Sequence, residues 1–146
     1  CPEERTWEVM YPAIEAMLAQ TQSAYAVDDA RLYLTGISMG GYGSWDLAMR
    51  QPNRWAAVVP ICGGGDETKG DLLVGLPLWA FHGDADPAVP VERSRNMITA
   101  IRQAGGDPKY NEYAGVAHDS WTQTYSDPDV FAWMLEQRRD EKSGPE

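Results

Sequence analysis

The sequence predicts an α/β fold: a parallel sheet of about four strands flanked by helices. Short apolar runs typical of buried strands alternate with longer segments of helical periodicity, and this alternation favours parallel strands joined by right-handed crossovers. The expected strands are residues 31–35, 55–61, 77–81 and 109–113. The expected helices are residues 6–22, 40–50, 90–104 and 127–138. At 146 residues the chain forms one domain at most.

The helices are expected from apolar spacing and from residues typical of helix ends. In the first helix, Thr6 is the expected N-cap and six apolar residues recur at helical spacing. These residues are Trp7, Met10, Tyr11, Ile14, Met17 and Leu18. The second helix should end ahead of Pro52, because a proline disfavours helical backbone in the residue before it. Pro90 suits the first turn of the third helix, and Asp127 opens the last one.

The strands are expected from their apolar character. Residues 55–61 form a continuous apolar run, as expected of a strand covered on both faces. Residues 63–70 are rich in glycine and polar residues, so we expect a loop there. Residues 140–146 are charged and lack apolar anchors, and the sequence predicts a disordered tail.

Charge and composition exclude some classes of partner. Twelve basic residues against 22 acidic ones give a formal net charge of −10, which argues against nucleic acid and anionic membrane surfaces. No apolar run approaches the roughly 20 residues that span a bilayer. The spacing of Cys1 and Cys62 fits no zinc pattern. Two interpretations stay open for them, namely two free buried thiols or one disulfide that closes a long loop.

The most informative motif is Gly36-Ile37-Ser38-Met39-Gly40, which lies between an expected strand and an expected helix. A Gly-x-Ser-x-Gly at such a junction is a nucleophile elbow, a sharp turn that exposes the serine hydroxyl at the end of the sheet. A serine hydroxyl is a poor nucleophile near neutral pH. It therefore needs a general base, and the base needs an orienting acceptor.

Two histidines and two aspartates are candidates for these partners. His118 lies in the loop after the last expected strand, where it is free to reach Ser38, and His82 at the end of the preceding strand is expected to be structural. Asp86 is the preferred acid because the turn after His82 returns it towards the last loop, with Asp84 as the alternative. The order Ser38, Asp86, His118 is that of α/β-hydrolases.

Other kinds of site are weaker candidates. His82, Asp84, Asp86, His118 and Asp119 have ligand chemistry suited to zinc or manganese, but a metal would leave the elbow unexplained. The glycines at 63–65 lack the Lys-Ser/Thr of a phosphate-binding loop. The sequence therefore predicts no metal and no cofactor. Trp121 and Trp7 are candidates to line a substrate pocket, although a tryptophan is more often part of the core.

Four stretches together resemble a bacterial esterase family, the carboxylesterase and polyhydroxybutyrate-depolymerase-like branch of the α/β-hydrolases. They are LTGISMGGYG at 34–43, PICGGG at 60–65, HGDADPAVP at 82–90 and HDSW at 118–121. The resemblance implies that residues 1–139 are the C-terminal part of a three-layer α/β-hydrolase domain. It also implies a serine carboxylesterase acting on small-molecule esters, with Ser38 as nucleophile, Asp86 as acid and His118 as base. The Met39 N–H is then one oxyanion donor.

The sequence departs from that family at its beginning. Family members start with further strands and a loop that supplies a second oxyanion donor, whereas this chain starts after that region. We therefore expect either a second chain that supplies those strands or a homo-oligomer. Two other functions stay open, a non-catalytic fragment or assembly module and a peptidase of the same fold. A thiol dienelactone hydrolase is disfavoured because the elbow carries Ser38 rather than Cys.

Overall fold

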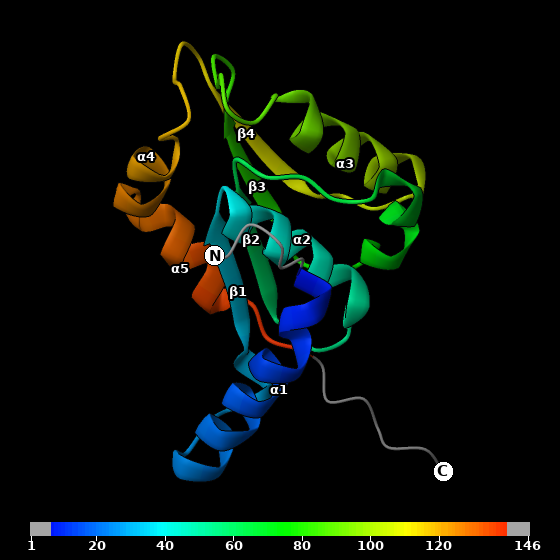
Figure 1. Ribbon diagram of the computed structural model, residues 1–146, viewed down its shortest axis with the longest axis vertical. Helices are drawn as coiled ribbons and strands as arrows, with labels where there is room; N and C mark the ends of the chain where they lie inside the picture. The colour runs from blue at the N-terminus through cyan, green and yellow to red at the C-terminus, as the bar shows by residue number, and fades with distance from the viewer. Residues whose placement is uncertain (1–6, 140–146) are drawn as a thin grey trace.

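A computed structural model describes residues 7–139 and contains the expected parallel sheet. Its four strands are β1 (Tyr33–Ile37), β2 (Ala57–Ile61), β3 (Trp79–Gly83) and β4 (Lys109–Tyr113). They lie in the order β1-β2-β3-β4, and every neighbouring pair is parallel (Figure 1). Because all four strands run the same way, their carboxyl ends meet at one edge of the sheet. The predicted fold class is confirmed.

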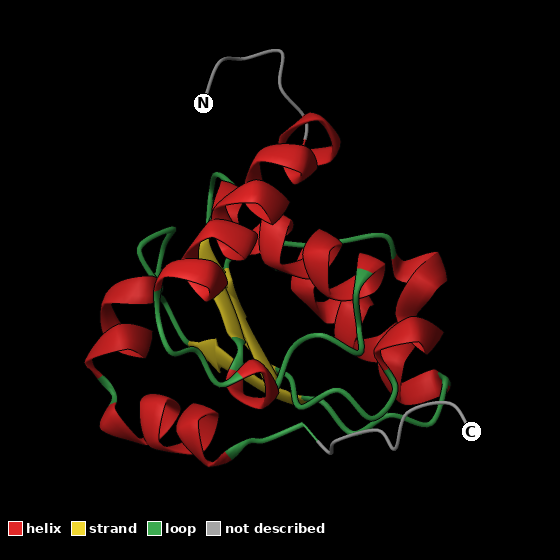
Figure 2. Ribbon diagram, turned by 90° about the horizontal axis from the view of Figure 1, so that it is seen from below, coloured by secondary structure: helices red, strands yellow, loops and turns green. Residues whose placement is uncertain are grey.

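Residues 7–139 also form five helices and two 3-10 segments. The helices are α1 (Trp7–Ala24), α2 (Met39–Arg50), α3 (Glu92–Gln103), α4 (Trp121–Ser126) and α5 (Pro128–Glu136). The 3-10 segments are η1 (Asp29–Arg31) and η2 (Glu67–Leu73). Helices lie on both faces of the sheet, which gives three layers (Figure 2).

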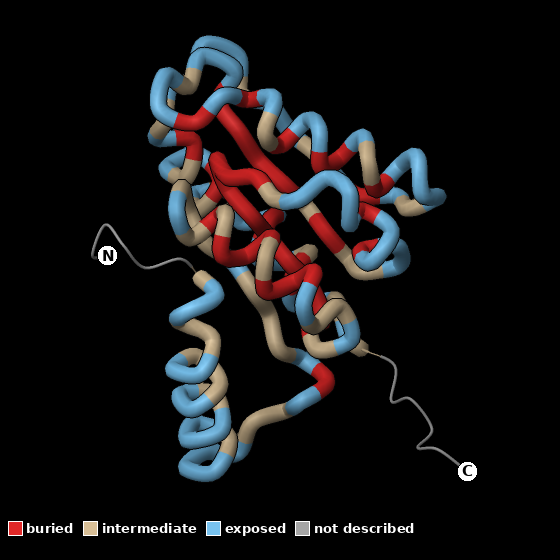
Figure 3. Tube along the Cα trace, turned by 45° about the vertical axis from the view of Figure 1, so that its right-hand side comes forward, coloured by how far each residue is buried: buried red, intermediate tan, exposed pale blue. Residues whose placement is uncertain are grey.

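Two hydrophobic cores lie on the two faces of the sheet. Residues of α2, η2 and α3 pack with Val58, Leu78 and Ala80 on one face. On the other face, residues of α4 and α5 pack with Val59, Phe81 and other strand residues. Since successive side chains of a strand point to opposite faces, β2 contributes to both cores and all five of its residues are buried (Figure 3). The continuous apolar run of β2 follows from this double coverage.

The structure shifts several predicted boundaries. β1 begins at Tyr33 rather than at residue 31, because Asp28 caps the 3-10 turn η1 by accepting the N–H of Ala30. The expected loop at 63–70 contains the start of η2. Helix α4, which precedes α5, was not predicted, because its six residues are too few for a periodic pattern to emerge. The predicted N-cap Thr6, Cys1 and the predicted tail lie outside the described residues.

The later part of helix α1 extends away from the main body of the molecule (Figures 1 and 3), whereas its first residue, Trp7, is hydrogen-bonded to Met39 of α2. The helix contains no buried residue, although Tyr11, Ile14 and Leu18 pack against the edge of the first core. β1 beside it is hydrogen-bonded to β2 alone within residues 7–139. The described helices include none that is long and apolar enough to cross a membrane.

Helix α2 crosses the sheet in very close contact with the end of β2. A Cβ added to Gly41 would lie 2.4 Å from the carbonyl oxygen of Ile61 and 3.2 Å from the Cα of Gly63. Real Cβ atoms essentially never approach backbone closer than 3.0 Å, so only glycine fits this position. At the neighbouring Gly40, the place where a Cβ would lie has no atom within 4 Å apart from the adjacent residues and the backbone of its own helix.

These two adjacent glycines give opposite predictions for stability. Gly41→Ala forces α2 away from β2 and should destabilise the protein by about 1–3 kcal/mol, the usual cost of overpacking. That corresponds to a fall in Tm of roughly 3–10 °C for a domain of this size. Gly40→Ala is the matched control and should leave Tm unchanged or raise it, because alanine is the better helix former. Thermal unfolding measures both, and equal Tm values for the two variants would contradict the close packing described.

Candidate active site

Ser38 lies at the sharp turn between β1 and α2. Its backbone has φ 51° and ψ −112°, a conformation that is rare for a residue with a side chain. Such strain costs of order 1–3 kcal/mol and persists only where surrounding structure enforces it. Here the Ser38 N–H donates to the carbonyl of Ile61 at 3.0 Å and also lies 3.3 Å from the sulfur of Cys62. The end of β2 therefore holds the turn that presents the serine.

Asp86 follows β3 in a tight turn that surrounds its carboxylate with N–H groups. Oδ1 accepts the backbone N–H of Ala88 at 2.8 Å and that of Val89 at 2.9 Å, and the carboxylate is fully buried. Burial alone would raise the pKa of Asp86, but hydrogen bonds from His118, Val89 and Ala88 outweigh it and hold the pKa below its ordinary value. The carboxylate is therefore ionised at neutral pH.

The loop that carries His118 is attached to the loop that carries Asp86. The N–H of Ala85 donates to Val116 at 3.1 Å, and Oδ1 of Asp84 accepts the N–H of Gly115 at 2.7 Å. The carbonyls of residues 116 and 117 lie where a Cβ of Gly83 would be, at 2.2 and 2.4 Å. The absence of a side chain at Gly83 thus allows the two loops to approach closely.

This arrangement brings Ser38, Asp86 and His118 together in one chain of hydrogen bonds. Nε2 of His118 lies 2.8 Å from Oγ of Ser38, and Nδ1 lies 2.7 Å from Oδ2 of Asp86. Because an ionised carboxylate only accepts hydrogen bonds, Nδ1 carries a proton and Nε2 is free to accept one from the serine. The imidazole is 27% exposed, so a substrate can reach it.

The two other candidate polar residues of this region have structural contacts. Asp84, the alternative acid, holds the loop at Gly115. His82 lies within β3, is completely buried and contacts the carbonyl of Val89 at 3.0 Å, which agrees with the structural role expected for it.

The candidate substrate-binding and oxyanion residues lie around the same turn. The ring of Trp121 meets that of His118 edge-on, with centroids 5.3 Å apart. The indole N–H of Trp7 donates to the carbonyl of Met39 at 2.9 Å, and its ring packs over Gly43. Met39 is the first residue of α2, where backbone N–H groups have no partner within the helix. Trp121 thus borders the base, and Trp7 borders the elbow.

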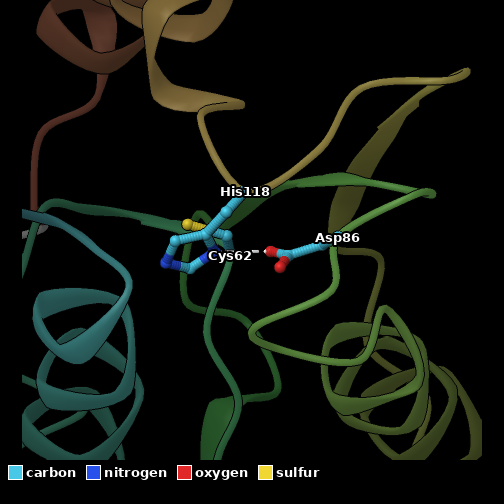
Figure 4. Close-up of side chains that lie close together, drawn as sticks. All are labelled: Cys62, Asp86 and His118. Atoms are coloured by element: carbon cyan, nitrogen blue, oxygen red, sulfur yellow. Dashed lines mark hydrogen bonds and ion pairs between the residues drawn. The ribbon is translucent and has the colours of Figure 1, made fainter.

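Cys62, at the end of β2, is the neighbour of this site that the sequence motifs did not identify. Its sulfur, a carboxylate oxygen of Asp86 and a ring nitrogen of His118 lie within 4.8 Å of one another (Figure 4). Burial raises the pKa of the Cys62 thiol, with smaller opposing effects from Ser38 and Ser120. The thiol is free, and its raised pKa keeps it in the protonated form, which is a poor nucleophile. The disulfide with Cys1, one of the two interpretations that the sequence left open, concerns a residue outside the described part.

The same three residues include ligands that zinc accepts. Their positions nevertheless fit proton transfer better, because both oxygens of Asp86 already accept N–H bonds and both nitrogens of His118 are engaged. The wider metal set considered from the sequence is not assembled, since Asp84 is exposed and its Oδ1 is bonded to Gly115.

Two pockets lie elsewhere on the described surface. The larger, of about 1110 Å³, is lined mostly by residues that precede the strands, at the end of the sheet opposite the triad. In a parallel sheet, ligands bind at the carboxyl ends of the strands, so this pocket is not the expected site. The second, of about 690 Å³, lies beside α2, and its lining includes Trp7, Tyr42 and Arg93.

Comparison with known proteins identifies the family. A model of the dienelactone hydrolase family matches residues 3–136, and the chain belongs to that family. Among curated proteins, the Aspergillus niger protein described as "probable feruloyl esterase C" is 27% identical over 115 residues. That match covers 76% of this chain but only 42% of the relative. The expected resemblance to α/β-hydrolase esterases is confirmed.

Solved structures with this fold include several esterases. A thermostable esterase superposes with a TM-score of 0.84 at 39% identity, over 87% of this chain and 36% of that one. Esterase PE8 has a TM-score of 0.70 at 22% identity, with 91% and 67% of the chains covered. An acylaminoacyl peptidase from Pyrococcus horikoshii has a TM-score of 0.65 at 17% identity, and the match covers 80% of this chain and 24% of the peptidase. The last two show the fold alone. The chain spans 42% of the feruloyl esterase relative and 36% of the thermostable esterase.

Proposed function

We propose that the chain carries the catalytic triad of a serine carboxylesterase that hydrolyses small acyl esters. The observation behind this proposal is the His118 imidazole, which lies 2.8 Å from the Ser38 hydroxyl and 2.7 Å from the Asp86 carboxylate. The family and the esterase relatives support ester hydrolysis. Serine, rather than cysteine, at the elbow supports an oxygen nucleophile within a family named for dienelactone hydrolases.

The proposed reaction proceeds in two halves. His118 Nε2 takes the proton of Ser38 as Oγ attacks the ester carbonyl, and the resulting tetrahedral intermediate expels the alcohol, which receives that proton. A water molecule then attacks the acyl-serine, again losing its proton to Nε2. Collapse of the second intermediate releases the carboxylic acid and returns the proton to Ser38. Asp86 keeps its charge throughout and stabilises the imidazolium.

The oxyanion of each intermediate requires hydrogen-bond donors. We assign one to the N–H of Met39, because it follows the nucleophile and opens α2, whose amino end carries partial positive charge. Each such donor is worth about 10²–10³ in rate. A second donor is expected from outside residues 7–139.

Trp121 and Trp7 are proposed to contact the substrate. Trp121 packs against the base and Trp7 against the elbow, so an acyl or alcohol group bound at Ser38 would meet at least one indole ring. Together with the feruloyl esterase relative, this favours an ester with an aromatic group. Comparing methyl ferulate with a short p-nitrophenyl ester, and each ester with its amide, distinguishes aromatic from aliphatic preference and esterase from peptidase.

Ser38→Ala should abolish turnover of a short p-nitrophenyl ester without unfolding the protein. The substitution removes only the nucleophilic hydroxyl and should lower kcat/KM by about 10⁴-fold or more, the scale of triad knock-outs. Steady-state kinetics give the rate, and the far-ultraviolet circular dichroism spectrum checks the fold. Full activity in a folded Ser38→Ala variant would overturn the proposed mechanism.

Substitutions of the two aspartates after β3 should differ sharply. Asp86→Asn presents an amide to His118 and favours the wrong tautomer, so kcat should fall by roughly 10³–10⁴-fold. Asp84→Asn is the matched control: it alters one contact, to the N–H of Gly115, and should lower kcat by less than about tenfold. Measuring kcat for both variants at pH 7 decides the assignment, and a larger loss in Asp84→Asn would move the acid to that residue.

We also propose that the free edge of β1 is covered by strands of a second chain. Among residues 7–139 this edge pairs with nothing, and unpaired strand edges readily recruit further strands. This chain spans 36% of the thermostable esterase, so that relative has further residues that are available for such strands. The partner would also bring the second oxyanion donor, so assembly and activity are linked.

Light scattering combined with an esterase assay tests this assembly. We expect a particle heavier than the 16.2 kDa of this chain, with turnover appearing in the assembled form. A particle with a multiple of 16.2 kDa would indicate a homo-oligomer, in which another copy of this chain takes the place of the second chain. A 16.2 kDa monomer with full turnover would contradict the proposal.

A further inference from the structure

His82 is a buried titratable residue beside the triad that the proposed mechanism does not use. Its side chain is 0% exposed, and Nε2 lies 3.0 Å from the carbonyl oxygen of Val89 and 3.4 Å from Oδ2 of Asp86. Nδ1 lies 2.8 Å from the hydroxyl of Ser94 on α3, and that hydroxyl is also 3.0 Å from the carbonyl of Gly63. His82 thus connects the Asp86 turn to α3 and to the loop after β2.

The positions of the protons follow from donors and acceptors. Nε2 faces a carbonyl and a carboxylate, which only accept, so Nε2 carries a proton. Ser94 has one hydroxyl proton and two possible acceptors. If it donates to Nδ1, His82 is neutral; if it donates to Gly63, Nδ1 must also carry a proton and His82 is a cation. Burial lowers the pKa of His82, which favours the neutral form with its proton on Nε2.

The Nε2–H group then acts on the Asp86 turn in two ways. Its hydrogen bond to the Val89 carbonyl anchors the residue whose own N–H binds Oδ1 of Asp86. The contact with Oδ2, at 3.4 Å, is longer than an ordinary hydrogen bond, so its effect there is that of a bond dipole with the positive end towards the carboxylate. Oδ2 is also the oxygen that accepts the hydrogen bond from Nδ1 of His118.

We propose that His82 is a positioning residue of the triad, which orients Asp86 and moderates the negative charge that acts on His118. This inference rests on the proposed esterase function. Ser94 supports the other side of the ring, because its hydroxyl lies 2.8 Å from Nδ1.

The other charges around His82 are few. Asp86 and His118 lie on the side of the triad. On β4, Glu112 is the register partner of His82, and Arg95 of α3 binds both oxygens of that carboxylate at 2.9 and 2.6 Å. Because Arg95 neutralises Glu112, the field of Asp86 dominates at His118.

Two substitutions separate positioning from simple packing. His82→Leu fills the space without a donor, and we expect kcat to fall about 10–100-fold with little change in KM, the usual range for residues that orient a site. The acidic limb of the pH profile of kcat/KM should move to higher pH. The reason is that Asp86 loses a compensating dipole, so its negative charge stabilises the protonated His118 more strongly. His82→Gln offers an amide N–H in the position of Nε2 and should keep the wild-type limb and most of kcat.

The direction of the pH shift is the decisive result. If His82 only filled space, His82→Leu would either fill it equally well and leave the acidic limb unmoved, or fit poorly, loosen Asp86 and move the limb to lower pH. Either outcome, or equal losses in the leucine and glutamine variants, would overturn the inference. Ester hydrolysis that is equally fast in Ser38→Ala and in the wild-type protein would instead contradict the proposed esterase mechanism itself.

Nitrogen-15 spectra of the imidazole rings test the same inference without turnover and without relying on the stability of a variant. The sequence has two histidines, so the two rings are readily assigned. We expect His82 to be neutral at pH 7 with its proton on Nε2, and the His118 signals to titrate at higher pH in His82→Leu than in the wild type. An imidazolium, or a proton on Nδ1 alone, would contradict the proposed role of His82.

Discussion

The site depends on one group, the His118 imidazole, which joins a hydroxyl that follows β1 to a carboxylate that follows β3. The two hydrogen bonds, at 2.8 and 2.7 Å, connect His118 to residues that precede it in the chain by 80 and 32 positions. They can form only because four parallel strands end at the same edge of the sheet. The order and register of the strands therefore matter to the chemistry as much as the identity of the three residues.

Close backbone contacts keep that geometry within narrow limits. The strained turn at Ser38 is held by the carbonyl of Ile61, and α2 reaches β2 because Gly41 has no side chain. On the other side, the loop before His118 crosses Gly83 so closely that a methyl group would not fit. Rigid packing of this kind costs backbone strain, and it holds the Ser38 hydroxyl and the His118 imidazole in a fixed mutual orientation.

Much of this arrangement could be predicted from the sequence, because local signals carried it. The apolar run of β2 and the Gly-x-Ser-x-Gly turn predicted a buried parallel strand and a strand-to-helix turn, which the structure contains. The order of Ser38, Asp86 and His118 predicted three side chains that lie close together, and they are within hydrogen-bond distance. Helix α4 and the 3-10 turns escaped notice because segments of three to seven residues show no reliable period. The position of Cys62 beside His118 and the Ser94 contact of His82 depend on tertiary packing alone, which no spacing in the chain reveals.

The central claim is that Ser38 is the nucleophile that His118 activates. The most direct measurement is mass spectrometry of the active, assembled protein after reaction with a fluorophosphonate, followed by peptide mapping. The account predicts one adduct per chain on Ser38, and no adduct in a folded His118→Ala variant within the same reaction time. Labelling of another residue, or equally fast labelling of Ser38 without His118, would contradict it.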